Sequence, residues 1–254
     1  NIFAQIYNQH YIIFIYLKRN FIMDYKVDIV MCIDITGSMQ DCIETVKKRA
    51  LQFWPDLQKA LEAATKNVTE VRVKVIGFRD FDADGSNALE ISRYFNLCDQ
   101  GSSDPKEYEA FVSSLVADGG GDEPENSLEA LALAMQSDWV QTGEKRRHVI
   151  VMFTDASAHK LEEANRSNPS YPENMPASFD ELTDIWMTTS GSQQSSKTKL
   201  KQSAKRLIVF GPQMYPWPEL YEAWDQVVYN PSKAGEGLDD VSYDDIINTI
   251  VGSI

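Results

Sequence analysis

Residues 27–39 read Val-Asp-Ile-Val-Met-Cys-Ile-Asp-Ile-Thr-Gly-Ser-Met. The mainly apolar, β-branched run up to Ile33 is typical of a strand that is buried on both faces of a parallel sheet. Asp34 closes this run, and Thr36-Gly37-Ser38 supply a turn before a helical pattern that begins at Met39. The sequence therefore predicts a buried strand, a polar loop and a helix in succession.

The rest of the chain repeats this alternation. The first helix is predicted to continue after a kink at Pro55 as far as Ala64. Further strands are predicted at 71–78, 91–97, 148–153, 207–210 and 227–229, and further helices at 104–117, 123–137, 179–187, 218–224 and 241–254. This order predicts an α/β fold, a doubly wound and mostly parallel six-stranded sheet with helices on both faces. Its ligand site is expected at the carboxyl ends of the central strands.

The composition restricts the possible partners. The chain of 254 residues has 24 Lys and Arg against 38 Asp and Glu, a formal net charge of −14. Because contact with phosphates needs a basic surface, we expect neither nucleic acid nor an anionic membrane as a partner. The three cysteines are an odd number without metal-ligand spacing, which predicts a reducing compartment and a cytoplasmic location.

Residues 1–22 differ in composition from the rest and are dominated by Ile, Phe, Tyr and Asn. Their longest apolar run, 11–17, is far shorter than the roughly 20 residues that span a bilayer. We interpret 1–22 as a non-native or accessory N-terminal extension, with the natural start at Met23. Residues 23–254 are predicted to form a single domain with an insertion at about 162–205, where the alternation is lost.

Two of the predicted buried strands lead into an aspartate, Asp34 and Asp155. Because the carboxyl ends of parallel strands emerge at one edge of a sheet, we expect the two carboxylates to converge. The hydroxyls of Thr36 and Ser38 can turn toward the same point, or they could cap the following helix. Carboxylate, hydroxyl and water oxygens are ligands that Mg²⁺ and Mn²⁺ prefer, so the sequence predicts a site for one of these cations.

A third loop, Gly119-Gly-Gly-Asp-Glu-Pro-Glu125, precedes a predicted helix and brings another carboxylate, Asp122. This carboxylate could reach the metal or its water shell. Alternatively, Asp122 could be the N-cap of the helix, with Glu125 as the second member of a capping box.

Asp34-Ile-Thr-Gly-Ser38 resembles the D-x-[ST]-x-S motif of von Willebrand factor A domains, whose metal-ion-dependent adhesion site (MIDAS) holds a divalent cation. The resemblance covers 23–210 in order, and the D-x-T-G-S-M form is similar to an intracellular subgroup that includes alpha-kinase-associated and bacterial proteins. It implies the von Willebrand factor A fold. It also implies metal ligation by Asp34, Thr36 and Ser38, by Asp155 through water, and by Asp122 in place of the usual threonine.

These features favour a divalent-metal-dependent protein-interaction module that is not an enzyme. Its partner is expected to be another protein, such as a component of a multi-protein complex. A metal-dependent phosphohydrolase of the aspartyl-phosphate type is an alternative, but such enzymes need a second acid where this chain has Thr36. A structural subunit with a degenerate metal site is a further alternative.

Overall fold

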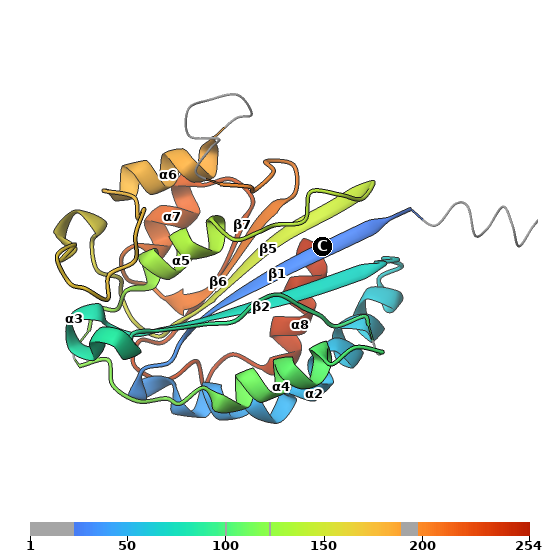
Figure 1. The fold of residues 1–254 in the computed structure, drawn as a ribbon, viewed down its shortest axis with the longest axis horizontal. Coiled ribbons are helices and arrows are strands. Elements are labelled where there is room, and N and C mark those ends of the chain that lie inside the picture. The colour runs from blue at the N-terminus through green and yellow to red at the C-terminus, as the bar shows by residue number, and fades with distance from the viewer. Residues whose placement is uncertain (1–22, 100, 122, 189–197) are drawn as a thin grey trace, which may run out of the picture.

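A computed structural model describes residues 23–99, 101–121, 123–188 and 198–254. They form one twisted sheet between two layers of helices (Figure 1). The strands are β1 (Tyr25–Asp34), β2 (Glu70–Phe78), β3 (Leu89–Ile91), β4 (Phe95–Asn96), β5 (Lys145–Phe153), β6 (Lys205–Pro212) and β7 (Val227–Ser232). Their order is β3-β2-β1-β5-β6-β7, with β4 also paired to β2. All pairings except those of β3 and β4 are parallel, so the predicted α/β fold with a mostly parallel sheet is confirmed.

In the described residues the sheet has seven strands, and the prediction of six was wrong. The stretch predicted as one strand over 91–97 is divided into β3 and β4, which both pair antiparallel with β2. Between them, Ser92 N donates to Val75 O (2.9 Å), and Val75 N donates to Ser92 Oγ (2.8 Å). The next side chain, Arg93, pairs with Asp104 at 2.7 Å. A side-chain oxygen thus takes the place of a backbone acceptor, and the regular strand pairing stops at Ser92.

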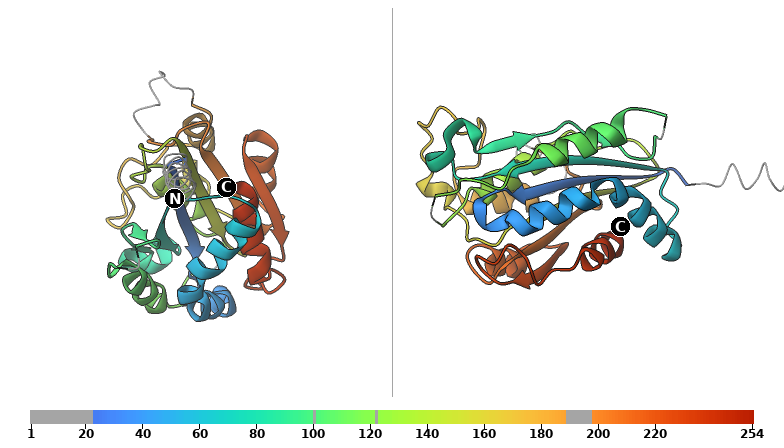
Figure 2. Two further views of the ribbon diagram at one scale, coloured as in Figure 1. Left: turned by 90° about the vertical axis from the view of Figure 1, so that its right-hand side faces the viewer. Right: turned by 90° about the horizontal axis from the view of Figure 1, so that it is seen from below.

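Helices cover both faces of the sheet, as Figure 2 shows from two further directions. One face packs against α2 (Gln40–Ala63), α4 (Asp104–Ser114) and α8 (Tyr243–Ser253). The other packs against α5 (Ser127–Met135), α6 (Phe179–Met187) and α7 (Trp217–Ala223). The short helix α3 (Phe81–Asp84) and the 3₁₀ turns Gly37–Met39, Gly85–Asn87 and Leu161–Glu163 lie in connections. Since successive strand residues point to opposite faces, the central strands supply apolar side chains to both layers.

Helix α2 continues through Pro55, as predicted, and has no break there. Proline removes the hydrogen bond that would go to the carbonyl four residues earlier, at Leu51. Both Pro55 and Leu51 are exposed, so water can satisfy that carbonyl.

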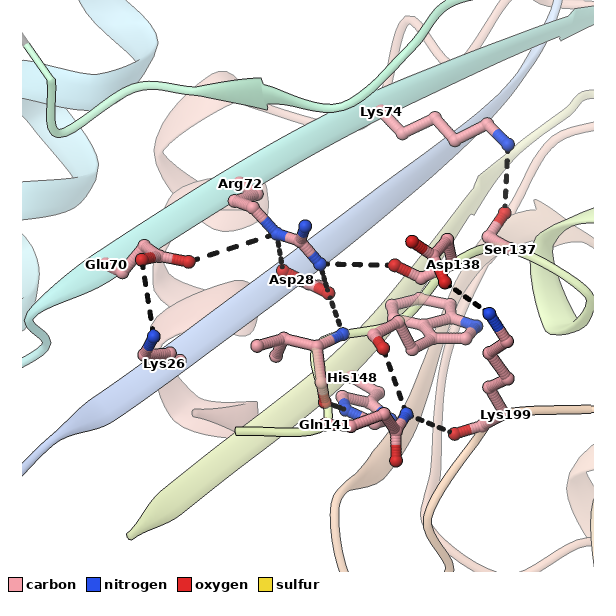
Figure 3. A network of polar contacts seen from close by, with 12 residues as sticks. Lys26, Asp28, Glu70, Arg72, Lys74, Ser137, Asp138, Gln141, His148 and Lys199 are labelled. Atoms are coloured by element: carbon pink, nitrogen blue, oxygen red, sulfur yellow. Dashed lines mark hydrogen bonds and ion pairs between the residues drawn. The ribbon is translucent and has the colours of Figure 1, made fainter. Parts of the chain in front are cut away.

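A polar network holds the amino-terminal ends of the central strands on the α5 face (Figure 3). Asp28 is 1% exposed and accepts two bonds from Arg72 (2.8 and 2.6 Å) and one from Val140 N (2.6 Å). Burial raises the pKa of Asp28, against the hydrogen bond from Arg72 that lowers it. Nearby, the ring of His148 stacks on Trp139. These contacts fix β1 and β5 to the segment that follows α5.

The predicted extension 1–22, and residues 189–197 of the predicted insertion, lie outside the described residues. Within that insertion, α6 forms over the predicted residues 179–187. Across the described ranges, no helix combines the length and the apolarity needed to cross a bilayer.

Candidate functional site

The carboxyl ends of β1 and β5 lie side by side because the two strands are parallel neighbours, with Ile33 paired to Phe153. Asp34 and Asp155 follow these paired residues and emerge at the same edge of the sheet. Their exposed fractions are 0% and 1%. The structure therefore brings two buried carboxylates to the edge where the sequence predicted a metal site.

Asp34 is held by hydroxyl groups and by the backbone. Its Oδ1 accepts bonds from Thr36 N (3.0 Å) and Thr36 Oγ1 (2.6 Å), and its Oδ2 accepts a bond from Thr154 Oγ1 (2.7 Å). Thr36 precedes the 3₁₀ turn, but its side chain does not cap that turn. The hydroxyl of Thr36 therefore forms a hydrogen bond with Asp34 and does not cap the helix end, contrary to the capping alternative.

Ser38 joins the first loop to Asp155. Its Oγ donates to Asp155 Oδ1 (3.0 Å) and lies 3.4 Å from Thr36 Oγ1. Asp155 Oδ2 accepts a bond from Gly237 N (2.8 Å), in the loop between β7 and α8. Ser38 is exposed, whereas Thr36 and Asp155 are buried. This group of oxygen atoms therefore opens to solvent on the side of Ser38.

Glycines allow the third loop to lie against the first. Gly119 and Gly120 have φ values of 71° and 92°. A Cβ on Gly119 would lie 2.0 Å from Asp84 Oδ1, and a Cβ on Gly120 would lie 2.5 Å from Thr36 Cγ2 and 2.8 Å from Glu125 Oε1. Both the backbone conformation and the lack of space require glycine here. The same distances place the Glu125 carboxylate and Thr36 next to Gly120.

Glu125 is the residue of this site that sequence reasoning missed. The sequence indicates only that Glu125 could be a member of a capping box, in a helix predicted to begin at 123. That prediction was wrong: α5 begins at Ser127, and Glu125 lies in the segment before it. Its N–H donates to Ser157 O (3.0 Å) and its carbonyl accepts a bond from His159 N (2.9 Å). This pairing with the chain after β5 holds the backbone out of the helix.

The side chain of Glu125 is 5% exposed, and among the described residues its Oε2 has no hydrogen-bond partner. A buried carboxylate oxygen without a partner is costly unless a ligand or a proton satisfies it. A glutamate between a glycine-rich turn and a strongly apolar helix was the signal in the sequence that could have identified it.

Burial and like charge act together on these carboxylates. Burial raises the pKa of Asp34 to about 6 despite the bonds from Thr36 and Thr154, and the charge of Asp155 adds to the rise. Burial also raises the pKa of Glu125 to about 9, with smaller contributions from Asp34 and other nearby carboxylates. The charges that act on both groups are all negative, so a bound cation would relieve their repulsion.

The other carboxylates have separate positions. Asp122 lies outside the described residues, so its role stays a prediction. Asp80 caps α3 through Oδ1, and its Oδ2 lies 3.1 Å from His159 Nε2. This pair supports the loop beside Glu125.

Arg79 connects the first and third loops. It is 5% exposed, and its Nε donates to the backbone oxygens of Ile35 (3.1 Å) and Asp118 (2.8 Å). Its Nη2 donates to Val116 O (2.7 Å). The guanidinium therefore holds the chain segments on which Thr36 and Gly120 lie.

The oxygen atoms at this edge fit a hard divalent cation. Thr36 and Ser38 donate their hydroxyl hydrogens to Asp34 and Asp155, which leaves oxygen lone pairs free to coordinate a cation. In the described part of the chain, no three His, Cys, Asp or Glu side chains lie close enough together to hold a metal by themselves. A cation here would therefore depend on the hydroxyls and on water as well as on carboxylates.

A family model for the von Willebrand factor A domain matches residues 98–170. This stretch contains the glycine loop, α5, β5 and Asp155. The match covers less than a third of the chain, and over that stretch the chain is similar to a von Willebrand factor A domain.

Over 162 residues the chain is 29% identical to the alpha-protein kinase vwkA of Dictyostelium discoideum, a match that covers 63% of this chain and 23% of the kinase. A crystal structure of the pilus adhesin SpaC from Lactobacillus rhamnosus GG aligns with a TM-score of 0.53 at 12% identity, over 90% of this chain and 30% of the adhesin. The chain thus spans less than a third of either protein, and the structural likeness supports the fold alone.

A structure of proximal thread matrix protein 1 from the mussel byssus, with a zinc-occupied MIDAS motif, aligns with a TM-score of 0.43 at 12% identity. The alignment covers 90% of this chain and 48% of the mussel protein. That score is too low to support an argument about this chain.

Proposed function

We propose that this chain is a divalent-metal-dependent protein-interaction module and not an enzyme, with Mg²⁺ or Mn²⁺ held at the carboxyl edge of the sheet. One observation carries the proposal: Thr36 and Ser38 donate to carboxylates and keep lone pairs free, beside a buried Glu125 oxygen that has no partner among the described residues. The proposed ligands, direct or through water, are Asp34, Thr36, Ser38, Asp122, Glu125 and Asp155.

The proposed partner is another protein, including a component of a multi-protein complex. A cation beside Ser38 can be reached from solvent, so a side-chain oxygen of the partner can complete its coordination. Ionised Asp34, Glu125 and Asp155 together exceed the charge of one divalent cation, so the occupied site stays negative. We therefore expect a neutral hydroxyl or amide oxygen, flanked by Lys or Arg on the partner, to bind better than a carboxylate.

The proposal includes a cytoplasmic location and a single domain over 23–254. Cys32, Cys42 and Cys98 are free thiols, which supports a reducing compartment.

The test is thermal unfolding of the parent protein and of Asp34→Asn in MgCl₂, in MnCl₂ and in EDTA. Metal at about 100 times its Kd stabilises a protein by about 2.7 kcal/mol, so the parent Tm is expected to rise by about 5 to 10 °C. The Asp34→Asn variant should lose most of this rise. The control is Asp180→Asn, the same chemical change at an exposed position in the first turn of α6, and it should respond like the parent.

An equal response of the parent and Asp34→Asn to metal would remove the basis of the proposal. If metal stabilises only the parent, a pull-down with the parent as bait in Mg²⁺ and in EDTA then tests the interaction itself. Partners that bind equally in both conditions would contradict a metal-dependent module.

A further inference from the structure

Four cationic side chains gather at the opposite, amino-terminal edge of the sheet, on the face that α8 covers. We call this group the basic patch: Lys66, Lys145, Arg147 and Arg206. Lys66 lies in the turn after α2, Lys145 and Arg147 belong to β5, and Arg206 belongs to β6. In the sheet, Arg147 is paired with Val27 on β1, and Arg206 is paired with Val149 on β5. Paired residues of neighbouring strands, and alternate residues of one strand, point to the same face, so Lys145, Arg147 and Arg206 lie on one face.

No carboxylate forms an ion pair with the patch within the described residues, and the contacts of its cations are to backbone carbonyls or a ring. Lys66 Nζ donates to Val251 O (2.5 Å), and Lys145 Nζ lies 4.0 Å above the ring of Tyr25. The Nη1 atoms of Arg147 and Arg206 donate to the carbonyls of the residues before them, at 3.0 and 2.6 Å. The Nε of Arg147 is buried and has no described partner.

Three cations on the other face of the same edge are paired with carboxylates. Lys26 lies 3.6 Å from Glu70, Arg72 lies 2.6 Å from Asp28, and Lys199 lies 2.5 Å from Asp138 (Figure 3). Arg146, also on that face, donates to Gln141 O, and no ion pair of Arg146 is found among the described residues. The basic patch therefore differs in gathering several cations without a carboxylate partner on one face.

The four cations repel one another. Burial, followed by the charge of Arg147, lowers the pKa of Lys66 and the pKa of Lys145. Burial and Arg147 also lower the pKa of Arg206, against smaller opposing effects of Tyr25 and Asp225. In a chain with a net charge of −14, this local positive field is an exception. An anion bound among the four side chains would relieve the repulsion and satisfy the free donor of Arg147.

We infer that the basic patch binds an extended acidic segment of a partner protein, with carboxylates at alternate positions of the segment. Lys145 and Arg147 are two residues apart on one strand, which sets them about 6.6 Å apart, the repeat of alternate side chains in an extended peptide. Arg206 on the neighbouring strand widens the surface so that more than one carboxylate is accommodated. A long polyanion such as nucleic acid, or an anionic membrane, is disfavoured because the rest of the protein repels it.

The test is fluorescence anisotropy with a labelled ten-residue peptide of alternating Glu and Ser. The parent protein is compared with the double variant Lys145→Gln/Arg147→Gln and with a matched control, Lys26→Gln/Lys199→Gln, which removes two paired cations from the other face. We expect the patch variant to weaken peptide binding about tenfold and the control to change it less than about twofold. Arg206→Gln supplies a second variant, expected to weaken binding about threefold. Thermal unfolding confirms that each variant folds.

Binding should be the same in Mg²⁺ and in EDTA, so the result is independent of the proposed metal site. Three outcomes would overturn the inference: no binding of the peptide at millimolar concentration, an equal loss in the control variant, or tighter binding to phosphatidylserine vesicles or single-stranded DNA than to the peptide.

Discussion

The two edges of the sheet carry opposite charges in different surroundings. At the carboxyl edge, Asp34 and Asp155 are buried and accept bonds from hydroxyls and a backbone N–H. At the amino-terminal edge, Lys145 and Arg147 are partly exposed and contact a ring and a carbonyl. In both places the charges form no ion pair among the described residues. The carboxylates are buried, and their site opens to solvent on the side of Ser38, whereas the two cations are themselves partly exposed.

This difference bears on the kind of ligand each edge can take. Buried oxygens with free lone pairs suit a compact, strongly charged ion, whereas partly exposed cations spread over several elements suit a longer anionic chain. A strand of nine residues such as β5 separates the two edges by about 30 Å, well beyond the Debye length of about 8 Å at physiological salt. Changes at one edge should therefore leave the other unaffected.

The largest effect is expected from Gly120→Ala, which should disrupt the candidate metal site at the carboxyl edge. The new methyl group would meet Thr36 and Glu125 at 2.5 and 2.8 Å, at a φ of 92°. We expect the free energy of unfolding to fall by about 3 to 4 kcal/mol, and stabilisation by Mg²⁺ to disappear. Urea unfolding with and without MgCl₂ measures both.

Gly85→Ala is the matched control, since Gly85 also has a positive φ (53°) but a Cβ added there would have no atom within 4 Å. It should cost only about 1 kcal/mol and keep the response to Mg²⁺. Equal losses in the two variants would show that the third loop does not depend on close contact with Thr36 and Glu125.

The next effect separates the role of Glu125 in metal binding from any role in folding. With a pKa of about 9, Glu125 is protonated in the folded protein at pH 7 without metal, whereas it is ionised in the unfolded chain. Because glutamine needs no proton to fold, Glu125→Gln should raise the unfolding free energy in EDTA by up to about 3 kcal/mol. Loss of an anionic ligand should nevertheless weaken Mg²⁺ binding by about 10- to 100-fold, measured by calorimetric titration. Glu236→Gln, at an exposed position paired with Lys233, should do neither. Unchanged Mg²⁺ affinity in Glu125→Gln would exclude it as a ligand.

The sequence predicted the central fold because the strand signals were strong and local. The apolar runs that became β1, β2 and β5 are largely buried, so each was recognisable without its neighbours. The edge strands β3 and β4 were not separable, because the interruption depends on a bond between Ser92 and Val75, which are 17 positions apart. Interruptions of this kind come from tertiary contacts and leave no local pattern.

For the candidate site, the sequence placed Asp34 and Asp155 at one edge because strand ends and parallel pairing follow from hydrophobic pattern. It did not reveal Glu125, whose position depends on pairing between its backbone and the chain around Ser157. The local pattern there equally suited a capping box, so only the long-range contact could distinguish the two.

An effect of similar size is expected from pH. Rising pH should lower stability in the absence of metal and should strengthen the stabilisation by Mg²⁺. Asp34, with a pKa of about 6, and Glu125, with a pKa of about 9, keep protons in the folded state that the unfolded chain has lost. In EDTA, the stability that these two groups contribute is therefore complete below about pH 4, and it should fall by about 4 kcal/mol as pH rises from 5 to 7. Stabilisation by Mg²⁺ should grow over the same range, because the cation competes with these protons.

Urea unfolding at pH 5, 7 and 9, in EDTA and in MgCl₂, checks this. In Glu125→Gln the further change between pH 7 and 9 should be smaller than in the parent. A stabilisation by Mg²⁺ that is the same at all three pH values would contradict coupling between the cation and these carboxylates.

The smallest effect is expected at the amino-terminal edge. There the direction of the change in unfolding free energy is more informative than its size. Lys145→Gln removes repulsion with Arg147 and Lys66, so it should raise the unfolding free energy by up to about 0.5 kcal/mol at low salt. Lys26→Gln, which breaks ion pairs with Asp24 and Glu70, should lower it by a similar amount. Because salt screens exposed charges, both differences should shrink in 1 M NaCl, where the Debye length is about 3 Å. Loss of stability in Lys145→Gln at low salt would mean that this lysine is already compensated within the chain, and the contrast between the two edges would then not hold.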